Sequence, residues 1–187
     1  MIYRVIYTDP PWKQSKGGLR KSRPNQGKSL DYDTISIEEI QSIQRSFMPE
    51  QDHVVFMWTI DKYLHESETM MKELGYRLHA RIIWDKENGV APAFTIRYSH
   101  EYLLWFYKNK LLPINAEQRG KYTTVIREKA TSHSVKPKAA YEMIERLYPD
   151  QPKIELFARN LRFGWSSWGK EVPKQICINI EKPQEES

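Results

Sequence analysis

Cysteine is nearly absent from this chain of 187 residues, which contains only Cys177. A single thiol excludes a disulfide within the chain and zinc sites built from several cysteines. The sequence therefore gives no support to redox chemistry. No metal is expected, because no cluster of His, Asp and Glu with the spacing of metal ligands is visible.

Long apolar runs are missing as well. The longest, such as residues 102–107, fall far short of the roughly 18 residues that a membrane helix needs. The first residues meet the acid Asp9 before the apolar core of a signal peptide could form. With 40% hydrophobic and 28% charged residues, the composition is that of an ordinary globular protein. We expect one domain over residues 1–182, a polar tail at 183–187, no membrane contact and a cytoplasmic location.

Positive charge is modest overall but concentrated in one segment. The net charge is +5, and residues 13–31 hold six basic side chains against one acid. Basic segments favour polyanions, because each phosphate contact releases counterions. The alternative is a solvated surface loop without a partner. The candidate nucleic-acid contacts in this segment are Lys13, Lys16, Arg20, Lys21 and Arg23.

Apolar patterning predicts alternating strands and helices. Strands are expected at residues 3–8, 53–59, 78–84, 102–107, 122–126 and 154–158. Helices are expected from residue 36, where Ser36 and Glu39 have capping-box spacing, over 61–74 before Gly75, and over about 137–148. This alternation indicates an α/β fold with a mostly parallel sheet flanked by helices. Trp58, Trp84, Trp105 and Phe106 fall within strands and are expected in the core.

Two segments follow strands in the position where open α/β sheets bind ligands, Asp9-Pro10-Pro11-Trp12 and Arg159-Asn160. The first suits the methylation of an exocyclic amine such as N6 of adenine, whose lone pair is delocalised into the ring. The Asp9 carboxylate and the Pro10 carbonyl would accept the two amine hydrogens and so localise the lone pair. Trp12 would stack on the target base, or it is a buried tryptophan after a strand-terminating turn.

The order of further blocks identifies a family. The chain carries, after Asp9-Pro10-Pro11-Trp12, the blocks Tyr32-Asp33-Thr34-Ile35-Ser36, Val55-Phe56-Met57-Trp58, Ile83-Trp84-Asp85-Lys86, Ser99-His100-Glu101, His133-Ser134-Val135-Lys136-Pro137 and Glu155-Leu156-Phe157-Ala158-Arg159. In this it resembles the adenine-N6 methyltransferases that include the catalytic subunit of the eukaryotic mRNA N6-methyladenosine writer and many bacterial and phage relatives. The resemblance covers nearly the whole chain.

The resemblance implies a Rossmann-like class I methyltransferase fold with a permuted order of motifs, and S-adenosylmethionine as cofactor. It assigns residues 9–12 to catalysis and Tyr32 to the surroundings of the target base. Asp9, Phe157, Arg159 and Asn160 would face the cofactor, with 155–159 replacing the Gly-x-Gly-x-x-Gly loop that the sequence lacks. Lys170 and Glu171 would bind the ribose, although family members commonly carry Asn at the position of Lys170.

Two points stay open within the resemblance. A lysine that grips the methionine carboxylate falls at His100 here, so either His100 performs this task or another cation such as Lys136 does. His100 can also be purely structural, and His133 is equally undecided. Only eight residues precede Asp9, so the segment that contacts the cofactor adenine in longer relatives is expected to be missing.

Three functions remain in competition. The first is a DNA adenine-N6 methyltransferase, favoured by analogy with bacterial and phage members. The second is an RNA adenine-N6 methyltransferase. The third is a catalytically silent nucleic-acid-binding subunit, which the intact Asp9-Pro10-Pro11-Trp12 disfavours and the altered positions of His100 and Lys170 mildly favour. A homodimer, or a heterodimer with a related subunit, would fit this family.

Overall fold

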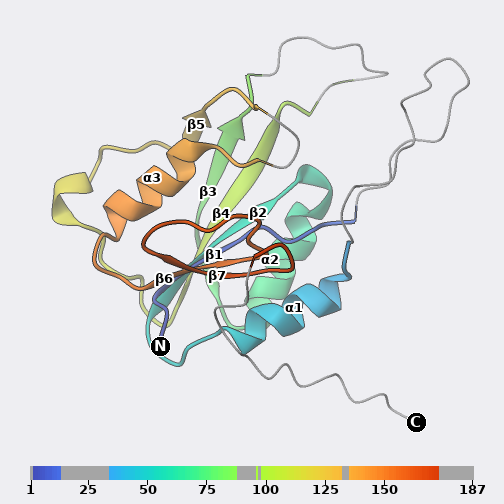
Figure 1. Ribbon diagram of the computed structural model, residues 1–187, viewed down its shortest axis with the longest axis horizontal. Helices are drawn as coiled ribbons and strands as arrows, with labels where there is room; N and C mark the ends of the chain where they lie inside the picture. The colour runs from blue at the N-terminus through green and yellow to red at the C-terminus, as the bar shows by residue number, and fades with distance from the viewer. Residues whose placement is uncertain (1, 14–33, 88–95, 97, 132–134, 173–187) are drawn as a thin grey trace, which may run out of the picture.

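A seven-stranded sheet organises the protein, with strand order β5-β3-β4-β2-β1-β6-β7. The computed structural model describes residues 2–13, 34–87, 96, 98–131 and 135–172 (Figure 1). The strands are β1 (Val5–Thr8), β2 (His53–Thr59), β3 (Arg77–Asp85), β4 (His100–Lys108), β5 (Val125–Arg127), β6 (Lys153–Leu156) and β7 (Trp165–Trp168). β1 lies near the middle, paired with β2 on one side and β6 on the other.

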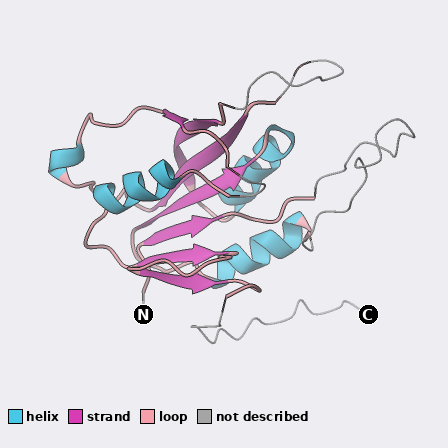
Figure 2. Cartoon of the chain, turned by 45° about the horizontal axis from the view of Figure 1, so that its top comes forward, coloured by secondary structure: helices cyan, strands magenta, loops and turns pink. Residues whose placement is uncertain are grey.

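Parallel pairing dominates the sheet. The pairs β1–β2, β1–β6, β6–β7 and β3–β5 are parallel, whereas β4 pairs antiparallel with both β2 and β3. The arrows of most neighbouring strands in Figure 2 accordingly point the same way. Because β4 is reversed, its first residues reach the edge of the sheet at which β1, β2 and β6 end. A mostly parallel sheet flanked by helices confirms the predicted Rossmann-like fold.

Three α-helices cover the two faces of the sheet. Ala140, Met143 and Ile144 of α3 (Lys138–Leu147) share one core cluster with Tyr7 and Phe56. Ile40 of α1 (Ile37–Ser46) and Met70 of α2 (Leu64–Glu73) share another with Ile6, Val55 and Met57. Since neighbouring strand residues point to opposite faces, α3 covers one face, and α1 and α2 cover the other (Figures 1 and 2).

The helix ends follow the local signals of the sequence. The Ser36 side chain accepts from the Glu39 N–H, and Glu39 accepts from the Ser36 N–H, which completes the predicted capping box of α1. Pro137 is the N-cap of α3, just before its first turn. Gly75 ends the α2 region with a φ of 81°, a conformation that glycine adopts without steric cost.

The structure departs from the sequence-based expectations in three places. The expected helix 61–74 consists of a 3-10 turn, η1 (Asp61–Tyr63), followed by α2. The strand expected at 122–126 begins only at Val125. β7 was not predicted, because two polar serines interrupt its short apolar pattern. The aromatic predictions hold, since Trp58, Trp84 and Phe106 are buried and Trp105 packs partly buried against the same core.

No helix in the described part of the chain is long and apolar enough to cross a membrane. Among the same residues, no group of three or more His, Cys, Asp or Glu side chains is arranged to hold a metal ion. A second 3-10 turn, η2 (Ala116–Gln118), completes the described elements.

Gly169 allows the segment after β7 to lie directly against the end of β6. A Cβ atom at this position would stand 2.2 Å from the carbonyl oxygen of Ala158 and 2.8 Å from its nitrogen. Both are backbone atoms, so no side-chain movement can make room. The Ala158 N–H also donates to the Trp168 carbonyl at 3.0 Å, which fixes the two segments together.

We expect Gly169→Ala to destabilise the protein by about 1 to 3 kcal/mol, because it forces two bonded backbone segments apart. Urea denaturation measures this loss. Gly120→Ala is the control, because Gly120 has a φ of 74° but open space around its Cβ position, so only backbone strain of about 1 kcal/mol is added. A smaller loss for Gly169→Ala than for Gly120→Ala would contradict the tight contact.

Candidate active site

Residues from four parts of the chain meet where β1 ends. Asp9 follows β1 directly, and its N–H donates to the carbonyl of Leu156, the last residue of β6, at 3.5 Å. Glu101 is the second residue of β4 and reaches the same edge because that strand is reversed. Lys136 lies two residues before α3. This edge is the usual position of ligand sites in open α/β sheets.

Four charged side chains form a continuous ion-pair network there. The Lys136 Nζ lies 3.1 Å from Asp9 Oδ1 and 2.8 Å from Glu101 Oε2. The Lys86 Nζ lies 2.5 Å from the other carboxylate oxygen of Glu101. Opposite charges alternate from Asp9 to Lys86, so each carboxylate contacts a cation. Asp9 stands at one end of this network, with 22% of its side chain exposed.

The network and its burial shift the pKa values in opposite directions. Burial raises the pKa of Asp9, and the charge of Lys136 only partly opposes this effect. Burial would also raise the pKa of Glu101, but Lys136 and Lys86 together outweigh it and lower that pKa. Burial disfavours the charged form of Lys136, yet the two carboxylates hold its pKa above the usual value. Lys136 therefore stays charged between them.

The Asp9-Pro10-Pro11-Trp12 segment is a tight turn fixed at both ends. The Trp12 N–H donates to the Pro10 carbonyl at 2.8 Å, and the Ile35 N–H donates to the Pro11 carbonyl at 3.4 Å. A carbonyl oxygen has two lone pairs, so Pro10 can accept one further hydrogen bond. Two prolines and these bonds restrict the turn, which suits a group that must be held in one orientation.

Trp12 is part of the core. Only 5% of it is exposed, its indole N–H donates to the Trp58 carbonyl at 2.9 Å, and its ring stacks on Tyr63 at 5.2 Å between centroids. One ring face is thus already covered. Of the two roles considered for Trp12, this environment favours the buried tryptophan over the stacking platform.

The predicted cofactor residues lie beyond β6 and β7. Phe157 has a φ of 61°, in the left-handed region that non-glycine residues rarely adopt, and its ring packs edge-on against Trp168. The Arg159 guanidinium lies 3.7 Å from a carboxylate oxygen of Glu171. Asn160 and Lys170 are exposed. All of these residues lie after β6 has ended at Leu156.

His100 lies against a neighbouring tyrosine. Its Nε2 lies 3.0 Å from the Tyr102 hydroxyl, and the two rings pack edge to face. The ammonium group that contacts Asp9 is that of Lys136. Which of the two side chains binds the methionine carboxylate stays a prediction.

Several predicted contacts lie outside the described residues, namely Lys16, Arg20, Lys21, Arg23, Tyr32 and His133. Lys13 is described and exposed, and its carbonyl accepts from the Tyr63 hydroxyl and from Lys62 at 3.4 Å. The start of the basic segment therefore lies beside Trp12 and η1.

Glu101 and Glu155 were not predicted as site residues. Glu101 is part of the block Ser99-His100-Glu101. Its position as an acid at the start of an apolar strand was the one sequence feature that could have marked it as a site residue. Glu155, in β6, is 8% exposed and accepts from the Tyr141 hydroxyl at 2.8 Å. Its pKa is raised to about 7, mainly by burial and also by the charge of Asp9, while the Tyr141 hydrogen bond and the charge of Arg162 oppose this rise.

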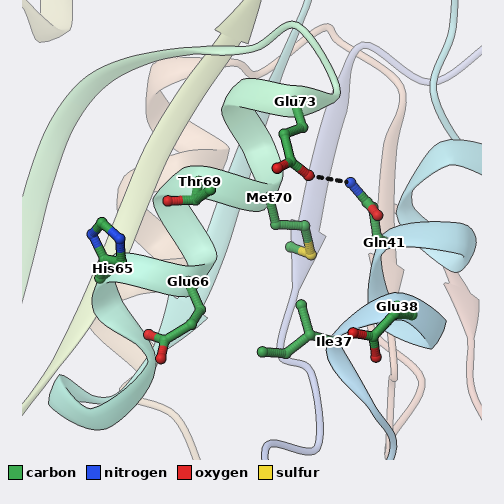
Figure 3. A pocket seen from close by; sticks show the side chains of 8 residues that line it. All are labelled: Ile37, Glu38, Gln41, His65, Glu66, Thr69, Met70 and Glu73. Atoms are coloured by element: carbon green, nitrogen blue, oxygen red, sulfur yellow. Dashed lines mark hydrogen bonds between the residues drawn. The ribbon is translucent and has the colours of Figure 1, made fainter.

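A separate groove of about 230 Å³ lies between α1 and α2 (Figure 3). Its lining residues are Ile37, Glu38, Gln41, His65, Glu66, Thr69, Met70 and Glu73. None of them belongs to the ion-pair network, and a Gln41–Glu73 hydrogen bond of 3.0 Å spans the groove. Three glutamates make it unfavourable for a phosphate backbone.

A family comparison agrees with this geometry. The model of the MT-A70 family matches residues 3–171. The chain belongs to the MT-A70 family. This match includes Asp9, Lys136 and the segment that follows β6, and so extends over all the described parts of the site.

Individual MT-A70 relatives cover nearly the whole chain. The type II methyltransferase M.MunI of Mycoplasma is 30% identical over 91% of this chain and 78% of its own length. The human N(6)-adenine-specific methyltransferase METTL4 is 28% identical over 92% of this chain and 38% of its own length. The human N(6)-adenosine-methyltransferase catalytic subunit METTL3 is 25% identical over 91% of this chain and 28% of its own length. The chain thus spans well under half of these two human proteins. The family and its relatives confirm the predicted class, an adenine-N6 methyltransferase.

We expect Trp12→Ala to lower the free energy of unfolding by about 3 to 5 kcal/mol, because it removes a buried ring and its hydrogen bond. Phe163→Ala is a matched control, since the Phe163 side chain is fully exposed and its loss should change stability by less than about 0.5 kcal/mol. Urea denaturation of both variants decides the matter. Equal free energies of unfolding for Trp12→Ala and Phe163→Ala would contradict the buried role and favour Trp12 as an accessible stacking platform.

We expect Lys136→Met to raise the pKa of Asp9 further, because the cation that opposes the effect of burial is removed. Carboxyl-carbon NMR across a pH titration measures the midpoint for Asp9 in both proteins. Lys86→Met serves as the control, since Lys86 contacts Glu101 but leaves the Asp9–Lys136 pair intact. An unchanged Asp9 midpoint in Lys136→Met would show that the ion pair does not govern its ionisation.

Proposed function

We propose that this protein transfers a methyl group from S-adenosylmethionine to the N6 amine of adenine in DNA. The observation that carries the proposal is Asp9. This carboxylate follows the interior strand β1, lies 3.1 Å from the ammonium group of Lys136, and keeps 22% of its side chain accessible. An accessible acceptor in a rigid and largely dry setting is what the methylation of a weakly nucleophilic amine requires.

The chemistry needs two acceptors for the amine hydrogens. Asp9 supplies one, and the free lone pair of the Pro10 carbonyl supplies the other. Their hydrogen bonds would localise the lone pair on the nitrogen, so that the nitrogen could accept the methyl group that the cofactor supplies. The methylated nitrogen would then pass one proton to water. Lys136 favours the ionised form of Asp9 against the effect of burial, and the buried Trp12 ring fixes the position of the turn.

The residues at this edge fit the proposed cofactor. S-adenosylmethionine has a cationic sulfonium, an amino-acid group and a ribose diol. Asp9 offers an anion to the positive groups, and Lys136 offers a cation to the carboxylate. Glu171, which is 56% exposed beside Arg159, can accept from ribose hydroxyls. Methyl donation from the sulfonium is the chemistry that the cofactor supplies.

DNA is our preferred substrate because the chain matches 78% of a type II methyltransferase of Mycoplasma, but only 28% of the adenosine-methyltransferase METTL3. The basic segment that begins at Lys13 would follow the phosphate backbone.

The RNA enzyme is the second candidate, and METTL3 supports it. The intact Asp9–Lys136 pair is unfavourable for a silent subunit, since a buried ion pair without a task costs desolvation. A cytoplasmic location, and a dimer with a second copy or a related subunit, remain part of the proposal.

We expect labelled methyl to pass from S-adenosylmethionine to adenine N6 in DNA, and Asp9→Ala to reduce the rate at least about 100-fold. Single-stranded DNA, duplex DNA and RNA of matched sequence are compared in one assay. Asp150→Ala is the control, because it removes an exposed acid just after α3 and should leave the rate unchanged.

The outcomes separate the candidates. Faster transfer to RNA than to either DNA would replace DNA as the substrate. Binding of nucleic acid without any transfer, together with no heat of S-adenosylmethionine binding in calorimetry, would favour the silent subunit. Near-normal transfer by Asp9→Ala would refute the assignment of Asp9.

A further inference from the structure

A further buried carboxylate, Glu155, lies close to Asp9 at the end of a chain of polar contacts. The Trp58 indole N–H donates to the Tyr7 hydroxyl at 2.5 Å. The Tyr7 ring lies 4.6 Å from the Tyr141 ring, and the two side chains interact electrostatically. Tyr141 then donates to Glu155 at 2.8 Å. The chain connects the core under the active site with Glu155.

This chain begins beneath the ion-pair network. The Lys136 ammonium lies 5.3 Å above the ring of Trp58, the first donor of the chain. Tyr7 and Glu155 are register partners on β1 and β6, and Asp9 follows Tyr7 by two residues, so all three point to the face covered by α3. Asp9 and Glu155 therefore belong to one electrostatic unit.

A buried hydroxyl extends the polar row to β7. Ser167 is the register partner of Glu155, is fully buried, and its Oγ has no hydrogen-bond partner within the described structure. Buried polar atoms usually have partners, so this unpaired hydroxyl adds to the polar groups that the interior holds on this side of the sheet. Glu155 also lies two residues before Phe157, where β6 enters the predicted cofactor segment.

The charges that face Glu155 leave its ionisation finely balanced. Its pKa is raised to about 7, and burial has the largest effect. The charge of Asp9, just after β1, also raises the pKa. The hydrogen bond from Tyr141, on α3, and the positive charge of Arg162, after β6, lower it. The Arg162 guanidinium is held over the Tyr141 ring at 4.5 Å and bonded to Glu145 at 2.6 Å.

We propose that Glu155 is a further carboxylate of the cofactor site, beside Asp9, and releases its proton when cationic S-adenosylmethionine binds. This inference rests on the proposed function. A nearby positive charge favours the ionised carboxylate, and the charge of Asp9 is already balanced by Lys136. Glu155 changes from the acid to the carboxylate and the proton passes to the buffer. The Tyr141 hydroxyl then stabilises the new charge by donating to it at 2.8 Å.

Calorimetric titration of S-adenosylmethionine into the full chain tests this linkage. Wild type and Glu155→Gln are compared at about pH 6 and about pH 8, in buffers of different ionisation enthalpy. Wild type should bind more weakly at the lower pH, by up to about tenfold for each pH unit below the pKa. Glu155→Gln should lack this dependence. Protons released by the cofactor itself contribute equally to wild type and Glu155→Gln, because both bind the same ligand. The difference between the two proteins therefore reports on Glu155. Glu142→Gln, on the exposed side of α3, should behave as wild type.

Tyr141→Phe provides a second, independent variant. It removes the hydrogen bond that lowers the pKa of Glu155, so the midpoint of the pH dependence should move upward. Circular dichroism confirms folding of each variant before titration.

Identical pH dependence and proton release in wild type and Glu155→Gln would overturn the linkage, while binding itself left the proposed function intact. An unmoved midpoint in Tyr141→Phe would also overturn it. Absence of binding by every protein at either pH would instead refute the cofactor, and the inference with it.

Discussion

The contact between Asp9 and Lys136 is the constraint on which the site depends. Moving a carboxylate out of water is costly, and burial alone would shift Asp9 toward its neutral form. An ionised carboxylate accepts hydrogen bonds more strongly than the neutral acid. Lys136 meets this need at 3.1 Å, but its own burial then requires further acids, and Glu101 supplies one. One functional charge thus determines the placement of three more.

The topology follows from this requirement. In a fully parallel sheet only the carboxyl ends of strands reach the ligand edge, so the side chains there lie at the start of loops. Reversing β4 brings the beginning of a strand to that edge, where Glu101 is held by β2 and β3 on both sides. A charge placed within a paired strand is less mobile than one on a loop. The reversed strand therefore contributes rigidity to the electrostatics of the site.

Local signals in the sequence predicted most of the fold. The strand before Asp9, the capping box at Ser36 and the start of α3 at Pro137 depend on neighbouring residues and were correct within a few positions. The short β7 has no such signal, because its pairing with β6 determines it. Lys136 and His100 could not be separated as cations, because the choice depends on which side chain the sheet brings to Asp9. The burial of Trp12 is likewise decided by Tyr63 and Trp58, far away in sequence.

The position of β1 has a consequence for how the protein is made. Its partner β6, the lysine that faces Asp9 and the segment from Phe157 to Glu171 all come from the last third of the chain. During synthesis Asp9 leaves the ribosome well before these partners, so its surroundings form only after residues up to 171 have been made. In any shorter nascent chain the end of β1 is without β6, and a chain that stops before Lys136 leaves Asp9 without its ion pair.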